Sequence, residues 1–217
     1  MLAKAPVPGE VKTRLCPPIT PEQAARVAAA AFHDTLDAVL AVSDVVPVVA
    51  LTGDLARAVD GAALAARLRE ITVLPQRGMT LGQRIAAAYA DTAAAVGHRP
   101  VLQIGMDTPQ VDAELLSQCL ERLDSDGVDA ALGMATDGGW WVLGVRRPEL
   151  AELIADIPTS RADTGARTMA ALRAASCHVV ELPELSDVDT WADATAVATQ
   201  APYGRFAAAV AKLDGRR

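Results

Sequence analysis

The stretch AKAPVPGEVKTRL at residues 3–15 follows a short apolar start and precedes a helical pattern that begins near residue 21. Its two prolines stiffen the loop, and its glycine permits a tight turn. Lys12 and Arg14 offer positive charge, Thr13 offers a hydroxyl, and the backbone N–H groups of such a loop can bind an anion. The GxxxxGK[ST] spacing of a Walker A loop is absent. The stretch is therefore either a phosphate-binding loop between a strand and a helix or a rigid surface loop with solvated charges.

Lysine is rare in this chain, and its placement points to the same loop. Lys4, Lys12 and Lys212 are the only lysines, while arginine supplies the other positive side chains. Two of the three lysines lie in residues 3–15. This placement suggests a chemical requirement for lysine there, and chance is the alternative.

The composition is that of a globular protein with a sizeable core. The 217 residues are 51% hydrophobic and 22% charged, which fits one domain over residues 1–217. No apolar run reaches the roughly 18 residues of a membrane span, and no signal peptide is recognisable. Three isolated cysteines favour neither disulfides nor a zinc site. The net charge of -7 disfavours nucleic acid as a partner but leaves room for a small anionic ligand in a local basic pocket. We expect a cytoplasmic protein.

Apolar runs of β type alternate along the chain with alanine-rich helical patterns. Strands are expected at residues 45–51, 71–74, 101–104, 128–132, 141–145 and 178–182. Helices are expected at 21–42, 54–69, 80–96, 112–123, 148–155, 164–175, 190–199 and 203–213, with Thr20, Thr80 and Asp112 as N-caps. This order predicts an α/β fold with a mainly parallel sheet and helices on both faces, with ligands at the carboxyl ends of the strands. Because so little precedes the first loop, we expect the chain to begin inside its first strand.

Two of the predicted strand ends carry polar turns. Residues 76–84, QRGMTLGQR, lead into a helix whose N-terminus favours anions, and Arg84 lies one turn inside it. A capped helix with a surface arginine is the alternative. Asp137 opens DGGWW at residues 137–141, where bare glycine backbone lets a substrate approach and the indoles can stack on a base or a sugar. The alternative is a hairpin turn that leads into a core strand, and Trp141 belongs to the core in either case.

Two acidic loops are candidates for a metal site. Asp107 ends a buried strand in IGMDTP, where a carboxylate is costly unless it is paired or binds a metal. Its oxygens suit Mg²⁺ or Mn²⁺, and a helix cap is the alternative. In LSDVDT, residues 185–190, Asp187 or Asp189 can provide a second ligand opposite Asp107. Asp189 or Thr190 can equally be an N-cap.

Taken in order, AKAPVPGxVKTRL, QRGxxLGxR, IGxDTP, DGGWW and DVDT resemble the radical-SAM/selenodomain-associated transferase family, whose members are glycosyltransferase-like. The motifs extend from Ala3 to Trp191, nearly the whole chain. That family is part of the nucleotide-diphospho-sugar transferase superfamily, and the 2-phospho-lactate guanylyltransferases are a related branch. The resemblance implies a GT-A-like three-layer fold with a mostly parallel central sheet.

The resemblance also implies roles for individual residues. The residues that it assigns to nucleotide binding are Ala3, Lys4, Pro8, Gly9, Lys12, Thr13, Arg14, Gly82 and Arg84. Those that it assigns to the substrate side are Gly138, Gly139 and Trp140, and those with a catalytic role are Lys12, Asp107 and Asp137. The implied ligands of Mg²⁺ or Mn²⁺ are Asp107 and Asp189, with Asp187 as the substitute for Asp189.

The chain departs from the family pattern at three positions. Trp140 stands where tyrosine is more frequent, and Met106 stands where a small residue is common. Gly105 takes the place of the first aspartate of a DxD motif. These departures bear on the shape of the pocket and on the metal site.

The expected function is transfer from a nucleotide-activated donor to a small-molecule acceptor. A nucleotide sugar is the first choice of donor, and nucleotidyl transfer from an NTP to a small phosphorylated acceptor is the alternative. A non-catalytic nucleotide-binding module is the third possibility. The histidines show no HxxxH or HExxH spacing and no GxSxG element is present, which disfavours zinc and serine hydrolases.

Overall fold

The structure is a computed structural model that describes residues 1–215. Its strands form two sheets joined by an isolated parallel bridge between Leu2 and Gly105. The first sheet has the order β1-β2-β3 and is parallel throughout, with β1 Leu2–Lys4, β2 Val48–Thr52 and β3 Thr72–Pro75. The second has the order β4-β6-β5-β7, with β4 Val101–Ile104, β5 Ala130–Ala135, β6 Trp140–Val145 and β7 Val179–Leu185.

Across the bridge the strand order is 3-2-1-4-6-5-7. Strand β6 pairs antiparallel with both β4 and β5, whereas β5 and β7 are parallel. The central sheet is therefore mostly parallel, with β6 reversed, as the GT-A-like prediction requires. The carboxyl ends of the parallel strands meet at one edge of the sheet, and the loops that follow them carry the predicted site.

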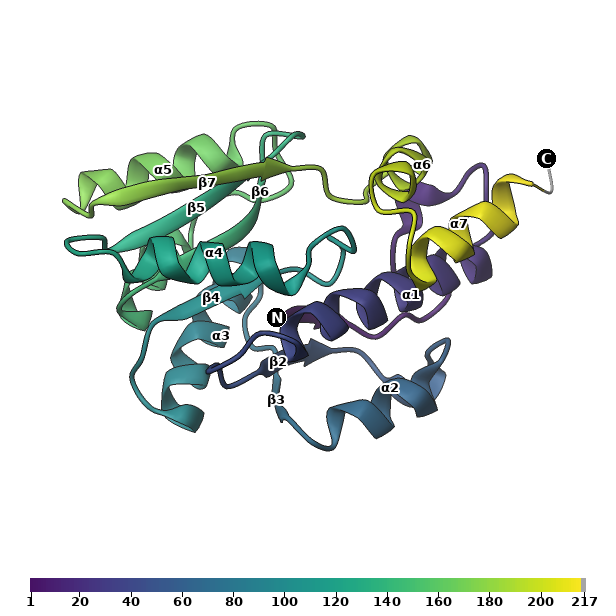
Figure 1. Cartoon of the computed structure of the whole chain (residues 1–217), viewed down its shortest axis with the longest axis horizontal. Helices are drawn as coiled ribbons and strands as arrows, with labels where there is room; N and C mark the ends of the chain where they lie inside the picture. Colours follow the sequence, from purple (N-terminus) through teal and green to yellow (C-terminus); the bar gives the residue numbers. More distant parts are fainter. Residues whose placement is uncertain (216–217) are drawn as a thin grey trace.

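Helices cover both faces of this sheet, which gives the three layers (Figure 1). One face packs on α1 Pro21–Leu40, α2 Gly61–Leu68 and α4 Ala113–Asp124. The other packs on α3 Leu81–Val96, α5 Thr164–Ala174 and the 3-10 helix η3 Pro148–Ile154. Beyond the sheet, α6 Trp191–Gln200 and α7 Arg205–Asp214 pack on α1 in a separate apolar cluster. Neighbouring residues of β5 alternate between the faces: Ala131 packs toward α4, and Leu132 packs toward α3 and α5.

The helix starts agree with the sequence. Thr20 forms a capping box with Gln23, which satisfies two backbone N–H groups at the start of α1. Thr80 and Asp112 accept from the backbone of Gln83 and Leu115, at the starts of α3 and α4. These caps confirm three predicted N-termini.

Two predicted helices have a different local form. Residues 148–155 were expected to be an α-helix, but they form η3, a 3-10 helix that begins at Pro148. The segment expected as one helix at 54–69 is split into the 3-10 helix η2 Leu55–Arg57 and α2. Asp60 adopts a left-handed conformation between them, at φ 53°, and this interrupts the helix.

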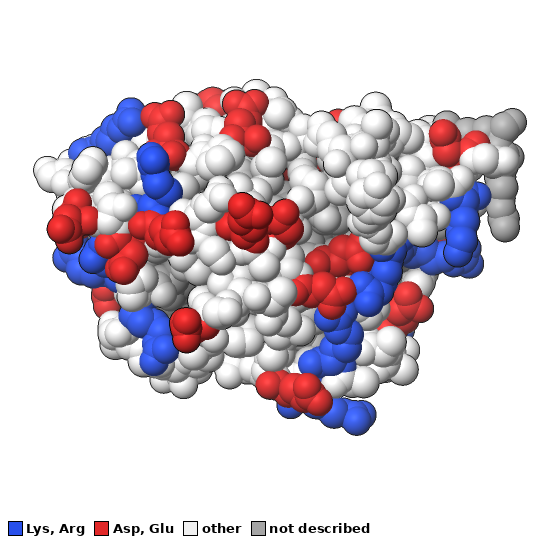
Figure 2. Space-filling view, viewed as in Figure 1, with Lys and Arg blue, Asp and Glu red and all other residues white. Residues whose placement is uncertain are grey.

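Among the described residues, no helix is both long and apolar enough to cross a bilayer. Acidic and basic side chains are interspersed on the face shown in Figure 2, most visibly on the right, where α1, α2 and α7 meet. There, Arg67 and Arg205 both contact Asp37 of α1. This ionic cluster joins α2 and α7 to the first helix.

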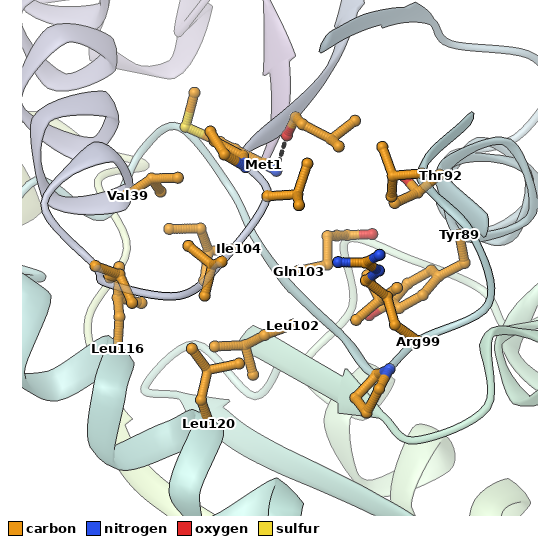
Figure 3. Close-up of a pocket in the computed structure, with 18 of the residues that line it drawn as sticks. Met1, Val39, Tyr89, Thr92, Arg99, Leu102, Gln103, Ile104, Leu116 and Leu120 are labelled. Atoms are coloured by element: carbon orange, nitrogen blue, oxygen red, sulfur yellow. Dashed lines mark hydrogen bonds between the residues drawn. The ribbon is translucent and has the colours of Figure 1, made fainter. Parts of the chain in front are cut away.

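An apolar cavity of about 370 Å³ lies at the opposite, amino-terminal edge of the strands. Figure 3 shows Leu102 and Ile104 of β4 beside Leu116 and Leu120 of α4 on its wall. Its lining is mainly apolar but includes Asp44 and Arg99, and none of the predicted site residues lines it.

Candidate functional site

A second cavity, of about 470 Å³, lies at the carboxyl edge of the sheet. It is lined by residues of the five predicted loops, by residues of the segment 159–164 and by Thr52 at the end of β2. Most of the predicted site residues line it: Ala3, Lys4, Lys12, Thr13, Arg14, Arg84, Asp107, Asp137, Gly139, Trp140 and Asp189. The fold thus brings together loops that are up to about 190 positions apart in the sequence, as expected for strand ends at one edge.

Lys12 is the centre of this cavity's charge network. Its Nζ lies 2.6 Å from Oδ2 of Asp107 and 3.1 Å from Oδ1 of Asp189. The side chain is only 12% exposed. Its backbone is left-handed, at φ 45° and ψ 42°, immediately before the 3-10 helix η1 Thr13–Leu15. A non-glycine residue in this region costs roughly 1–2 kcal/mol, so the buried ion pairs of Lys12 offset a local strain.

The three acids lie close enough to share one cation. One oxygen each of Asp107, Asp187 and Asp189 lies within 4.8 Å of the others. The backbone N–H of Val188 donates to the Asp107 carbonyl at 3.2 Å, which holds the two acidic loops side by side. Hard carboxylate oxygens at this spacing suit Mg²⁺ or Mn²⁺.

The alternative interpretation of Asp107 and Asp189 as helix N-caps is wrong. The N-cap of α4 is Asp112, five residues after Asp107. The N-cap of α6 is Thr190, which forms a capping box with Asp193. Asp107 and Asp189 therefore direct their carboxylates toward Lys12, not toward helix ends.

The pKa values in this cluster shift in opposite directions. Burial, together with the negative charges of Asp189, Asp107 and Asp137, raises the pKa of Asp187 to about 6, and Lys12 opposes the change. Burial also works against the charged form of Asp189, but Lys12 and Arg14 outweigh it and lower the pKa of that carboxyl. For Lys12 the burial effect, which lowers the pKa, is overcome by the two carboxylates, and its pKa rises. The ammonium therefore stays charged at neutral pH.

The backbone of Gly105 lies against the carboxylate of Asp107, a close approach that the sequence did not reveal. A Cβ at this position would lie 2.3 Å from Oδ1 of Asp107. The Asp107 carboxylate thus occupies the space of a side chain at position 105. This chain has one acid where a DxD motif has two, and the further acids come from the loop before α6.

The remaining cations lie around the rim. Arg14 is 62% exposed and pairs with Oδ2 of Asp189 at 2.9 Å. The ammonium of Lys4 donates to the Glu10 carbonyl. Nε of Arg84 donates to the Gly78 carbonyl at 3.1 Å, which folds the arginine back over the start of its own helix.

Four predicted residues do not line the cavity: Pro8, Gly9, Gly82 and Gly138. Gly82 allows close helix packing, since a Cβ there would lie 2.6 Å from the Ala155 carbonyl oxygen at the end of η3. Gly138, at φ 88°, would place a Cβ 2.1 Å from the Ala162 carbonyl oxygen. Gly9 has φ 77° with open space around its α-carbon. For Gly82 and Gly138 the geometry supports a packing role, and their contact with a ligand stays a prediction.

On the acceptor side, Asp137 Oδ1 accepts from the Gly139 backbone at 2.7 Å and so shapes the DGG turn. Trp140 is half-buried on the cavity wall. Trp141 is buried, and its indole donates to the Pro183 carbonyl at 2.8 Å, which confirms it as a core residue.

Sequence reasoning missed one wall of the cavity, formed by Thr159, Ser160 and Arg161. This loop is held against the DGG turn by a hydrogen bond from Gly165 N to the Gly138 carbonyl, at 2.8 Å. Its residues have no recognisable motif. The sequence signal nearest to this loop is Gly165, which follows it at the start of α5. A Cβ at Gly165 would lie 2.5 Å from the Gly139 carbonyl oxygen.

Comparison with known proteins gives a family for this arrangement. Residues 35–161 match the DUF2064 family, described as an uncharacterized protein conserved in bacteria. The chain belongs to this family. No protein of curated function matches it in sequence. The finer resemblance, to the radical-SAM/selenodomain-associated transferases, rests on the sequence motifs.

Solved structures support the fold assignment. A protein of Desulfovibrio desulfuricans G20, provisionally assigned as a nucleotide-diphospho-sugar transferase, superposes with a TM-score of 0.83 at 26% identity, over 99% of this chain and 94% of its own. A CMP:2-keto-3-deoxy-manno-octonic acid synthetase in complex with CTP gives 0.56 at 12% identity, over 93% and 97%. A cytidylyltransferase of Leptospira borgpetersenii gives 0.54 at 15% identity, over 86% and 76%. The last two show a shared fold only.

Proposed function

We propose that this protein is a nucleotide-dependent transferase whose reaction takes place in the cavity at the carboxyl edge of the sheet. The observation that carries the proposal is the contact of Lys12, from the first loop, with Asp107 and Asp189, from two later ones. Cations beside clustered carboxylates suit a ligand whose phosphates are held partly by the protein and partly by a divalent metal. The similarity to the Desulfovibrio protein supports the same class.

In this proposal the first loop holds the phosphates. Lys12 and Arg14 supply the positive charge, and Thr13 supplies a hydroxyl on the same wall. Arg84, on the opposite rim, can contact the same anion or the group attached to it. Catalysis would come from positioning and from stabilising the charge that develops on the departing phosphate oxygens.

The residues present fit a divalent metal. Asp107, Asp187 and Asp189 offer three oxygens within reach of one ion, and we propose Mg²⁺ or Mn²⁺ there. When bound, the ion would neutralise the diphosphate of the donor. Asp187 joins the pair expected from the sequence as a third ligand, not as a substitute.

Glycosyl transfer from a nucleotide sugar is the preferred reaction, because the Desulfovibrio protein, which is similar over 99% of this chain, is provisionally assigned as a nucleotide-diphospho-sugar transferase. The acceptor oxygen would bond to the anomeric carbon, the bond to the diphosphate would break, and a nucleoside diphosphate would leave. Asp137, on the acceptor side, would take the acceptor proton. In nucleotidyl transfer the same cations would face a leaving pyrophosphate.

Product analysis tests this choice. The protein is incubated with nucleotide sugars and NTPs, with Mg²⁺ or Mn²⁺, after a thermal-shift panel has selected the donors that raise the melting temperature. A nucleoside diphosphate supports glycosyl transfer, whereas pyrophosphate supports nucleotidyl transfer. A donor that binds tightly without either product, across a broad acceptor panel, would identify a binding module. Turnover that persists in Asp107→Ala would refute the assigned site.

Three expectations from the sequence stay predictions: a single domain over residues 1–217, a cytoplasmic location and the absence of a nucleic-acid partner.

A further inference from the structure

The Lys12 ammonium occupies the carboxylates that a metal would need. It contacts one oxygen of Asp107 and one of Asp189, two of the three residues that can share an ion. Mg²⁺ and Mn²⁺ bind carboxylate oxygens at about 2.0–2.2 Å. An ammonium at 2.6 Å and a divalent ion at that distance compete for the same carboxylates and repel each other.

We propose that Lys12 acts as an internal cation that keeps divalent metal off Asp107 and Asp189 until the phosphates of a nucleotide draw its ammonium away. The proposal rests on the proposed function and adds an order of binding to it: nucleotide first, or nucleotide and metal together, but not metal alone. Lys12 is then a positioning residue for the metal as well as a contact for phosphate.

The surroundings of Lys12 make the movement feasible. Its charge sits at the end of a flexible four-carbon stem on the cavity wall, so the ammonium can move while the backbone stays in place. Asp189 keeps a second cation when Lys12 leaves, because Arg14 holds its other oxygen at 2.9 Å. Asp107 loses its ammonium partner and becomes free to bind the metal. When Lys12 leaves, each carboxylate thus has another cation: Arg14 for Asp189, and the metal for Asp107.

Two consequences follow from linkage. Nucleotide and metal should each raise the affinity for the other, by the same factor, because each favours the state in which Lys12 has left the carboxylates. Removing the Lys12 charge should weaken this coupling, since the carboxylates are then open in the free protein, and the coupling that remains comes from direct attraction between the metal and the phosphates. Couplings of this kind typically amount to about 5- to 150-fold.

Mn²⁺ titration followed by electron paramagnetic resonance, without nucleotide, tests the proposal. Lys12→Met keeps most of the stem and removes the charge. We expect it to bind Mn²⁺ at least about tenfold more tightly than the unaltered protein. Lys4→Met is the matched control, because it removes the same charge from the same loop, while Lys4 contacts the Glu10 carbonyl. Its Mn²⁺ affinity should stay within about twofold of the unaltered protein. Equal affinities in Lys12→Met and Lys4→Met would overturn the proposal.

Lysine-selective NMR provides a measurement on the unaltered chain. Only three lysines are present, so the Lys12 side-chain signal is assigned by its loss in Lys12→Met. Inorganic pyrophosphate without metal should shift this signal, and Mg²⁺ alone at the same concentration should leave it in place. A shift with Mg²⁺ alone would overturn the proposal, as would no shift with pyrophosphate. If Lys12→Met fails to fold, Lys12→Gln takes its place in both experiments.

These results are separable from the proposed function. Metal affinity without nucleotide does not depend on any transfer reaction. Tighter Mn²⁺ binding by Lys12→Met, together with no product from any donor, would support the role of Lys12 and refute the transferase. Product formation together with unchanged Mn²⁺ binding by Lys12→Met would support the transferase and refute the role of Lys12.

Discussion

The close approach of the DGG turn to residues 158–165 can be tested with a pair of glycine substitutions. Gly138 and Gly9 both have positive φ, at 88° and 77°. A Cβ at Gly138 would lie 2.1 Å from the Ala162 carbonyl oxygen, whereas a Cβ at Gly9 meets nothing within 4 Å. Alanine at either position therefore introduces backbone strain, and only Gly138→Ala adds a clash with a second loop.

The magnitudes follow from these contacts. Left-handed backbone costs an L-residue roughly 1–2 kcal/mol, which is the whole expected effect of Gly9→Ala. In Gly138→Ala the carbonyl of Ala162 must retreat, and such overpacking costs about 1–3 kcal/mol. The hydrogen bond from Gly165 N to the Gly138 carbonyl, which contributes about 1 kcal/mol, should weaken at the same time. Gly138→Ala should therefore lose about 2–4 kcal/mol more than Gly9→Ala.

Urea and thermal denaturation, followed by circular dichroism, measure the difference. For a chain of this size, 1 kcal/mol lowers the melting temperature by about 2–4 °C. We expect Gly138→Ala to melt at least about 5 °C below Gly9→Ala. Equal melting temperatures would refute the close approach of the two loops, because backbone strain alone would then explain both variants. A larger loss in Gly9→Ala would show that the first loop is packed more tightly than the structure indicates.

Three further outcomes are expected. Asp107→Asn should lower kcat/KM with the selected donor by at least about 100-fold, because it removes a charge that pairs with Lys12 and fits a metal ligand; steady-state kinetics test this, and a change under tenfold would contradict it. Thr190→Ala should lose about 1 kcal/mol in urea denaturation through the α6 cap, whereas Ser at the same position should restore most of it. The folded pKa of Asp187, about 6, lies above its unfolded value of 3.8, so this group stabilises the fold at low pH and that stability is lost as pH rises through about 4 to 6. Asp187→Asn should therefore melt higher than the unaltered protein at pH 7 and equally near pH 4, and a constant difference would argue against the raised pKa.

The fold was largely predictable because its signals are local. Thr20, Thr80 and Asp112 each cap a helix through residues three positions away, so the sequence contains both partners. The strands are short apolar runs between turn residues, and the alternation with helices predicts a mainly parallel sheet. The reversed direction of β6 was indicated only by the hairpin alternative for residues 137–141, which the antiparallel pairing of β5 with β6 confirms. The pairing of β6 with β4, across about 40 residues, left no signal in the sequence.

The candidate site was predictable as a set of residue types but not as a set of contacts. Lys12 and Asp107 were each recognised from their own loops, yet their ion pair joins positions 95 apart in the sequence. Residues 159–161 were missed because no motif marks them. Their place on the wall depends on the Thr164 hydroxyl, which accepts from Arg161 N and donates to the Pro158 carbonyl. Gly82 and Gly138 were assigned to ligand contact because the sequence does not reveal which close approach a glycine permits.

The acidic cluster shows how one departure from a familiar motif can be compensated elsewhere in the fold. Gly105 leaves no acid at the first position of a DxD motif, and the Asp107 carboxylate fills the vacated space. The loop before α6 supplies two acids in its place, because the Val188 N–H donates to the Asp107 carbonyl and brings Asp187 and Asp189 alongside. Three carboxylates with one buried ammonium leave the cluster with excess negative charge. Burial raises the pKa of Asp187, that excess raises it further, and a divalent cation would relieve the excess charge. The same excess of negative charge stabilises the contacts of the Lys12 ammonium, from the first loop, with Asp107 and Asp189.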